Sequence, residues 1–284
     1  MRYRYLDVDG TASRVIEAGD PEAPPLLMVH GIALTAEVWL RNIDALARDR
    51  RVVSVDLLGH GFTCPAGGAQ PDVPAKIRHL LRIADVLEFS RFAICASSYG
   101  ALLAIQCYFA ARDRISQLVI NGSGSSFNSE AQFAAQISNP GAVFNADVTR
   151  LTPAMWRDRL AFNFFDPSLI PPELPMIAAH SYAQPWARAC WDSTIAEMRD
   201  LERFRRYRIL HRLAEIAVPT LVFWGEQDPG GTLAAASEAV ARMPAARLVA
   251  YDRCGHYPMI EHAEDWNREV LAFLALPDPA KTPA

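Results

Sequence analysis

The first third of the chain alternates short apolar segments with segments that carry apolar residues at helical spacing. Strands are expected at 2–8, 13–19, 25–31, 50–61, 92–96 and 115–122, and helices at 36–48, at 72–88 and from about residue 98. The segment "PLLMVHG" is apolar throughout, which is typical of a strand that is buried on both faces. This strand and helix alternation predicts a mostly parallel sheet covered by helices on both sides.

The alternation stops after residue 122 and returns near residue 219. Between them, helix-like aromatic patterns are interrupted by "SNPG", "LTP" and "DPSLIPPELP", and no strand pattern is convincing. Beyond the interruption we expect strands at 219–228 and 246–256, with helices at 232–242 and 261–275. The sequence therefore predicts one core domain made of residues 1–122 and 214–284, with a helical cap inserted at 123–213.

Composition narrows the class of protein. The chain has 284 residues, 51% of them apolar, and a net charge of -4, so it can bury a large core and has no basic field for nucleic acid. It shows no signal core and no apolar run of membrane-spanning length, so we expect a cytoplasmic protein without a membrane partner. The five cysteines are an odd number, widely spaced, and include no C-x-x-C pair, so we expect neither a disulfide framework nor a zinc site. We expect no cofactor.

The segment "FAICASSYGALLAIQ" places polar residues where a strand gives way to a helix. Ser98 stands between two small residues, Ala96 and Gly100, which matches the G-x-S-x-G turn of serine nucleophiles with Ala in the first position. Small neighbours are needed because this turn brings the strand and helix backbones close together. Ser97 is the rival, but Tyr99 occupies the second position after it. Two hydrogen-bonded turn serines are the simpler alternative.

A serine hydroxyl needs a base and an acid that orients the base. Asp228 follows the strand that ends at "VFWG", and His256 follows the next strand, so both occur in the order and context that the serine turn requires. Glu226 is the fallback acid and His262 the fallback base. An Asp that caps a helix and a loop histidine are the corresponding structural alternatives.

Acyl transfer also needs two backbone N–H groups that stabilise an oxyanion. We expect one from Tyr99, at the amino end of the helix after Ser98, where the helix dipole adds to the effect. The other is expected from Ile32, because "VHGIALT" closes the third strand at the carboxyl edge of the sheet. The His30 side chain is expected to bind its own loop.

Five motifs together resemble those of the α/β-hydrolase fold family over nearly the whole chain. They are "VHGIALTAEVW", "VDLLGHGFT", "CASSYGALLA", "VFWGEQDPGG" and "CGHYPMIEH". The resemblance implies an eight-stranded, mostly parallel sheet with a helical cap. It also implies nucleophile Ser98, acid Asp228, base His256 and oxyanion donors Ile32 and Tyr99. A serine nucleophile argues against the dehalogenase and epoxide hydrolase branches, which use Asp there.

Within that family, "QLVINGSGSS", "FFDPSLIPPEL" and "CGHYPMIEHAEDWNREVLAFL" are similar to the meta-cleavage-product hydrolases, which cut a C–C bond in vinylogous 1,5-diketones. The group has Asn before its serine and Trp after its histidine, whereas this chain has Ser97 and Tyr257. The group's cap arginine, which binds the substrate carboxylate, is missing from "LPMIAAHSYAQ", and Arg188 is the expected substitute.

The cap is rich in large apolar side chains, which favours an apolar or aromatic small-molecule substrate. These residues are Phe127, Phe133, Phe144, Met155, Trp156, Phe162, Phe164, Phe165, Trp186 and Trp191. Most of them are expected to pack the cap; we assign Trp186 and Phe127, with Tyr257 and Arg188, to substrate binding.

The predicted function is that of a serine hydrolase. The missing arginine favours an ester or neutral ketone as substrate, and C–C bond hydrolysis comes next. A ligand-binding receptor and a cofactor-free lyase on the same fold remain alternatives. The sequence also permits a homodimer.

Overall fold

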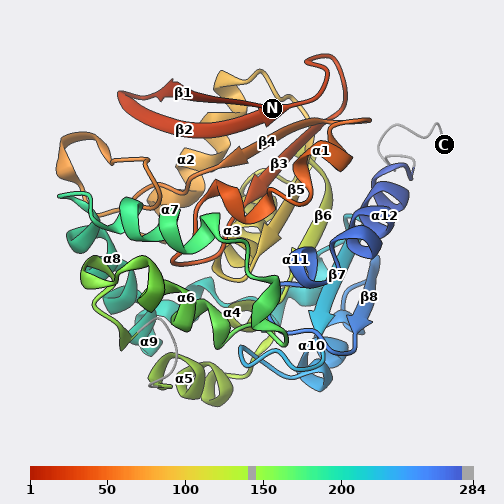
Figure 1. Ribbon diagram of the computed structural model, residues 1–284. Helices are drawn as coiled ribbons and strands as arrows, with labels where there is room; N and C mark the ends of the chain where they lie inside the picture. Colours follow the sequence, from red (N-terminus) through yellow and green to blue (C-terminus); the bar gives the residue numbers. More distant parts are fainter. Residues whose placement is uncertain (140–144, 277–284) are drawn as a thin grey trace.

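The computed structural model describes residues 1–139 and 145–276, which form one eight-stranded sheet with helices on both faces (Figure 1). The strand order is β1-β2-β4-β3-β5-β6-β7-β8. Only the β1–β2 and β2–β4 pairs are antiparallel. The strands are β1 (Arg2–Val8), β2 (Thr11–Ala18), β3 (Pro25–Val29), β4 (Arg51–Val55), β5 (Phe92–Ser97), β6 (Ile115–Asn121), β7 (Thr220–Gly225) and β8 (Ala246–Tyr251). The mostly parallel α/β-hydrolase sheet expected from the sequence is confirmed.

The two faces of the sheet bury alternate residues of the same strands. In β3, Leu27 belongs to the apolar cluster beneath α2, α3 and α10, while Leu26 belongs to the cluster beneath η1, α1 and α12. This two-sided burial explains why β3 is apolar at every position. The core helices are η1 (Ala36–Trp39), α1 (Ile43–Leu46), η2 (Ala66–Gly68), α2 (Val73–Val86), α3 (Tyr99–Ala110), η3 (Arg112–Arg114), α10 (Leu233–Val240), α11 (Pro258–Glu261) and α12 (Ala263–Leu274).

The described part of the segment between β6 and β7 contains helices joined by turns and no strand, and in Figure 1 its green to teal helices gather on one side of the sheet. It contains α4 (Gly124–Phe127), α5 (Glu130–Ser138), η5 (Val148–Arg150), α6 (Pro153–Ala161), η6 (Pro167–Leu169), α7 (Glu173–Tyr182), α8 (Ala187–Arg199), α9 (Leu201–Phe204), η7 (Arg205–Tyr207) and η8 (Leu210–Glu215). Its treatment as a separate cap remains a prediction. Phe144 lies outside the described residues.

Two predicted helices are interrupted. The helix expected at 36–48 is a 3₁₀ turn followed by the short α1, and the break lets the Asn42 side chain donate to Met259 O at 2.9 Å. The helix expected at 261–275 begins earlier, at Pro258, and breaks at His262, whose ψ is 42°. Tertiary hydrogen bonds and backbone turns override the helical spacing at both places. No helix among the described residues is long and apolar enough to cross a membrane.

A buried ionic cluster joins β2, η1 and the end of β4. Arg14 binds Glu37 and also Asp56, the latter with its Nη1 2.9 Å from Oδ2. The Asp56 carboxylate further accepts the backbone N–H groups of Ala36 and Phe62, at 2.8 and 2.9 Å. Because both acids are almost fully buried, the Arg14 guanidinium is what makes their burial tolerable.

Replacing Arg14 with Leu should therefore destabilise the fold by about 3–5 kcal/mol, because two carboxylates lose their buried counter-ion. Urea unfolding followed by circular dichroism measures the change. Arg82→Leu is the matched control, since Arg82 also binds two carboxylates, Asp9 and Asp85, but at the exposed surface. The control should lose much less stability. Equal losses for the two variants would contradict the importance of burial.

Candidate active site

Ser98 occupies a strained turn between β5 and α3. Its backbone has φ 55° and ψ −121°, a region that a residue with a side chain rarely adopts. Its N–H donates to Asn121 O at 2.8 Å, and its carbonyl accepts the Ser123 hydroxyl at 3.0 Å. A side chain at Gly100 would overlap the His30 carbonyl oxygen of β3's end, so the turn requires glycine there. Ser97 is the last residue of β5 and is fully buried without strain of this kind.

Asp228 and His256 form a buried pair after β7 and β8. The His256 Nδ1 lies 2.8 and 2.9 Å from the two Asp228 oxygens, and the Gly230 N–H donates to Oδ1 at 2.7 Å. Burial lowers the pKa of His256, but the charge and hydrogen bond of Asp228 outweigh this effect and leave it above its usual value. The aspartate therefore holds the imidazole with its Nε2 available.

The alternative acid and base lie elsewhere. Glu226 is exposed at the end of β7. His262 stacks on Tyr251 with ring centroids 4.7 Å apart, and its Nε2 lies 3.4 Å from Arg253 O. Neither residue joins the buried aspartate–histidine pair.

The end of β6 connects the serine turn with this pair. A Cβ placed on Gly122 would lie 3.0 Å from Asp228 Oδ2 and 3.1 Å from His256 Nδ1. The preceding residue, Asn121, accepts the Ser98 N–H through its carbonyl. Ser98, Asp228 and His256 thus border one short segment at the carboxyl edge of the sheet, and the glycine leaves room for the acid and base.

The loop after β3 lies against Ser98. A Cβ on Gly31 would be 3.0 Å from Ser98 Cβ and 3.7 Å from its Oγ. The buried His30 accepts the Leu57 N–H at Nε2, at 3.0 Å, so its proton is on Nδ1 and is donated to Gly31 O at 2.6 Å. Since the peptide is trans, this bond fixes the Ile32 N–H on the opposite side from that carbonyl.

Tyr99 is the first residue of α3, where N–H groups have no partner within the helix. The arrangement therefore offers two backbone donors beside the serine turn, from Ile32 and Tyr99. Burial raises the pKa of the Tyr99 phenol well above its usual range, so its side chain stays neutral.

Three of the residues assigned to substrate binding lie in or near the buried interior. Tyr257 packs against His256 and Phe164, with centroid distances of 5.1 and 4.9 Å. Phe127 is buried, and its ring lies 6.2 Å from that of Trp224. Trp186 is half-buried just before α8 and packs on the larger apolar cluster.

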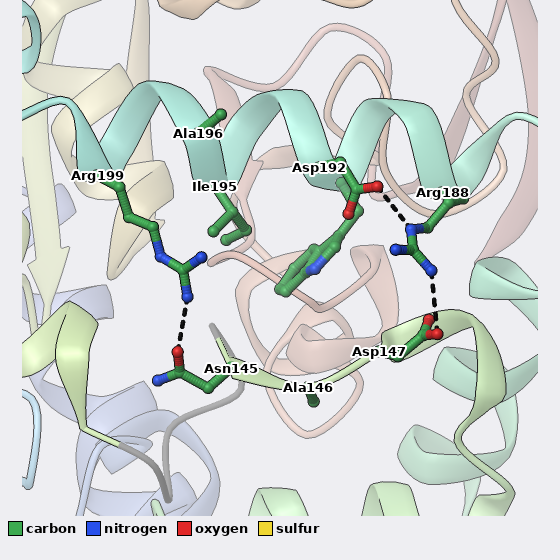
Figure 2. Close-up of a pocket in the computed structure, with 9 residues that line it drawn as sticks. Asn145, Ala146, Asp147, Arg188, Asp192, Ile195, Ala196 and Arg199 are labelled. Carbon is green, nitrogen blue, oxygen red and sulfur yellow. Dashed lines mark hydrogen bonds and ion pairs between the residues drawn. The ribbon is translucent and has the colours of Figure 1, made fainter.

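Arg188 lies away from the serine group. It donates to Asp192 at 2.6 Å and pairs with Asp147 at 3.0 Å, and its side chain is 54% exposed (Figure 2). The cavity that it borders has a volume of about 470 Å³ and lies between α8 and residues 145–147. Ser98, Asp228 and His256 are not among the residues that line this cavity. The two carboxylates already neutralise the cation that the sequence analysis assigned to a substrate carboxylate.

The structure adds a residue that sequence reasoning missed. Asn128, 2% exposed after α4, donates from Nδ2 to Gly230 O at 2.9 Å, and Arg208 donates to its carbonyl. Gly230 in turn holds Asp228, so a hydrogen-bond chain runs from the helical segment to the candidate acid. A buried amide that follows a run of serines gives no periodic signal, which is why the pattern alone could not find it.

A second missed residue is Glu261, in α11. Its carboxylate accepts the Gly255 N–H at 2.8 Å and the Phe165 N–H, also at 2.8 Å. It thereby ties the loop that carries His256 to the helical segment. Among the described residues, no group of three or more His, Cys, Asp or Glu side chains is arranged to hold a metal ion.

Comparisons with known proteins agree with the mostly parallel sheet described above. The sequence profile of the alpha/beta hydrolase family matches residues 26–269. The chain belongs to this family and is an enzyme that acts on a small-molecule substrate.

Curated relatives match over most of their length. A 2-hydroxy-6-oxononadienedioate/2-hydroxy-6-oxononatrienedioate hydrolase of Paraburkholderia xenovorans (strain LB400) is 28% identical, over 96% of this chain and 94% of that protein. A 2-hydroxymuconate semialdehyde hydrolase of Pseudomonas sp. (strain CF600) is 28% identical, over 90% and 88%.

Solved structures show the same fold. The 2-hydroxy-6-oxo-6-phenylhexa-2,4-dienoate hydrolase of Rhodococcus sp. strain RHA1 superposes with a TM-score of 0.79 at 22% identity, covering 97% of this chain and 99% of that one. An N-acyl homoserine lactone degrading enzyme gives a TM-score of 0.74 at 19% identity, covering 96% and 100%. The fold is thus shared by enzymes with different substrates.

Asn128→Leu should lower kcat about 10- to 100-fold, because the loop that orients Asp228 loses its support. Asp228 raises the pKa of His256, and a less firmly positioned Asp228 should raise it less. The fall in kcat/KM at acidic pH, the acidic limb of the profile, should therefore move to lower pH. The measurement is kcat/KM against pH.

Gln132→Ala is the control for this variant. The exposed Gln132 side chain accepts the Ser129 N–H in the capping box of α5, and no hydrogen bond joins it to Asp228 or Gly230 among the described residues, so the variant should leave the limb in place. A shift of the same size in both variants would indicate general loosening of α5 instead of a specific effect on Asp228.

Proposed function

We propose that this chain is a cofactor-independent serine hydrolase that cleaves a C–C bond next to a carbonyl, with Ser98 as nucleophile, His256 as base and Asp228 as its orienting acid. The strained backbone of Ser98 carries the proposal. Strain of this kind persists where function requires it, and here it presents a serine beside a buried Asp–His pair.

His256 takes the Ser98 proton on Nε2, because Asp228 occupies Nδ1. The serine oxygen then attacks the carbonyl carbon, and the resulting oxyanion accepts hydrogen bonds from the N–H groups of Ile32 and Tyr99. His30 supports this step by holding the Gly31–Ile32 peptide in one orientation.

Collapse of the intermediate breaks the C–C bond and leaves an acyl-enzyme. The electron pair of that bond departs with the leaving fragment as a stabilised carbanion, which takes the proton carried by His256. Water, deprotonated by the same imidazole, then hydrolyses the acyl-enzyme and releases the acid. With an ester, the same steps expel an alcohol.

The names of the curated relatives favour the C–C reaction over the ester that the missing arginine suggested. The relatives described above are hydrolases of conjugated hydroxy-oxo acids, and they match almost the whole chain. Phe127, Tyr257 and Trp186 provide apolar surface for such a substrate. The division into core and cap, the cytoplasmic location and a homodimer belong to this proposal as sequence-based predictions.

Ser98→Ala should lower kcat by about 10⁶-fold on every substrate that the wild type cleaves, because no other nucleophile replaces the hydroxyl. A fluorophosphonate probe should label wild type stoichiometrically and Ser98→Ala not at all. Ser97→Ala is the control and should keep both turnover and labelling. Wild-type turnover by Ser98→Ala would overturn the assignment, and labelling without turnover of any ester or diketone would favour a receptor.

The pH profile tests the base. His256 must be neutral to accept a proton, so kcat/KM should fall as the pH decreases through its raised pKa and reach a plateau above it. Asp228→Asn should lower the plateau about 10⁴-fold, because the imidazole loses its tautomer and support. The acidic limb should also move to lower pH.

Glu226→Gln serves as the control for Asp228→Asn, because Glu226 is exposed on the same loop. It should change neither the plateau nor the limb. An effect of Glu226→Gln as large as that of Asp228→Asn would show that the acid has been assigned to the wrong residue.

A further inference from the structure

Two neighbouring aromatic side chains of the helical segment bury donor groups that have no acceptor. Tyr182 ends α7 and Trp156 lies in α6; they are 2% and 0% exposed, and their ring centroids are 5.3 Å apart. Among the residues that the structure describes, neither the Tyr182 hydroxyl nor the Trp156 Nε1 donates to an acceptor. A buried donor without a partner costs about 1–3 kcal/mol, so two on adjacent rings call for an explanation.

The position of Tyr182 links these donors to the serine turn. Burial raises the pKa of its hydroxyl, and a hydrogen-bonding interaction with the Ala33 backbone lowers it, so the hydroxyl lies beside Ala33. An interaction that lowers the pKa of a phenol donates to its oxygen, so Ala33 supplies no acceptor for the hydroxyl proton. Ala33 has φ 64° and directly follows Ile32, in the loop whose Gly31 borders Ser98. The hydroxyl therefore lies beside the loop that provides the proposed oxyanion donor.

The chemistry of the two groups defines what they can bind. Burial raises the pKa of the Tyr182 phenol far above neutral pH, so the hydroxyl stays protonated and can donate. An indole N–H donates only. Trp191 packs edge-on against Tyr182, with centroids 5.5 Å apart, and is a third aromatic ring of this group. A planar, conjugated group that ends in an oxygen acceptor satisfies both donors and contacts the rings.

We propose that the Tyr182 hydroxyl and the Trp156 indole N–H form a donor subsite that binds a carboxylate or carbonyl oxygen on a conjugated part of the substrate. This inference rests on the proposed hydrolase function. It adds which part of the substrate the protein recognises, which the cleavage reaction alone does not specify. Neutral donors recognise the oxygen here, while the guanidinium of Arg188 is paired with Asp147 and Asp192.

The first test compares Tyr182→Phe with wild type on two substrates. One is a conjugated aryl diketone acid, and the other is phenyl acetate, which has no oxygen beyond its ester group. The ratio of their kcat/KM values should fall about 10- to 100-fold in the variant, as expected for losing a hydrogen bond to a charged acceptor. An unchanged ratio, whether both activities fall together or neither falls, would overturn the subsite.

Tyr207→Phe is the matched control, because Tyr207 is also a buried tyrosine whose hydroxyl has no partner. It contacts Phe204 instead of the aromatic group around Tyr182. Arg188→Ala is a second control for the cation of the outer cavity. Both should leave the ratio unchanged, and a fall in the ratio for Arg188→Ala alone would assign recognition to the arginine and overturn the proposal.

A binding measurement separates the subsite from the catalytic proposal. Calorimetry with 2,4-hexadienoate should show binding to Ser98→Ala, and the Kd should rise about 10-fold or more in Ser98→Ala/Tyr182→Phe. The corresponding amide distinguishes a carboxylate from a neutral carbonyl acceptor, since either oxygen satisfies the proposal. Equal Kd values for the two proteins would overturn it. If wild type cleaves esters but no diketone, the C–C reaction fails while this measurement still decides the subsite.

Discussion

The close approach of β3, β5 and α3 at Ser98 is the constraint on which the site depends. The turn holds a non-glycine residue at φ 55°, and Gly100 allows the helix to start against the His30 carbonyl. Conformations of this kind cost about 1–3 kcal/mol and persist only when the surroundings fix them. Here the fixing comes from β6, through Asn121 O and the Ser123 hydroxyl. The Asn121 side chain is itself held by the Trp266 indole at 2.6 Å.

Buried titratable groups are a second feature of the carboxyl edge of the sheet. The Asp228–His256 pair and the Arg14 cluster both bury titratable groups, and both compensate them with hydrogen bonds. The two differ in consequence. Arg14 is held between Glu37 and Asp56, so its charge serves the fold, whereas Asp228 binds His256 at Nδ1 and leaves Nε2 for the proton transfer that we propose.

The helical segment does more than cover the edge of the sheet. Thr194 in α8 accepts the buried Lys76 ammonium at 3.1 Å, and Glu197, one turn later, accepts the Val73 N–H at 3.1 Å, so α8 is tied to α2. Asn128 and Glu261 make the corresponding connections to the loops of Asp228 and His256. The packing of this segment is therefore linked to the positions of Asp228 and His256, the acid and base that we propose.

The sequence by itself determined the elements and most of the candidate chemistry. Apolar strands, the small residues around Ser98 and the order of Ser98, Asp228 and His256 are local features, because each depends on residues within one strand and the turn that follows. The family assignment follows from these features, and the profile match confirms it. The roles of these residues stay predictions.

Only the tertiary structure decided how distant side chains meet. The sequence predicted that Arg188 binds a substrate carboxylate. In the structure Arg188 instead forms an ion pair with Asp147, which is distant in the chain, at the outer cavity. The helix expected at 36–48 breaks where its side chains bind partners such as Met259, more than two hundred residues away. Asn128 donates to the Gly230 carbonyl, and Tyr182 lies beside the loop that contains Ala33. Both partners belong to distant parts of the chain. Such contacts depend on which faces of different elements pack together, and the spacing of residues within one segment does not determine this.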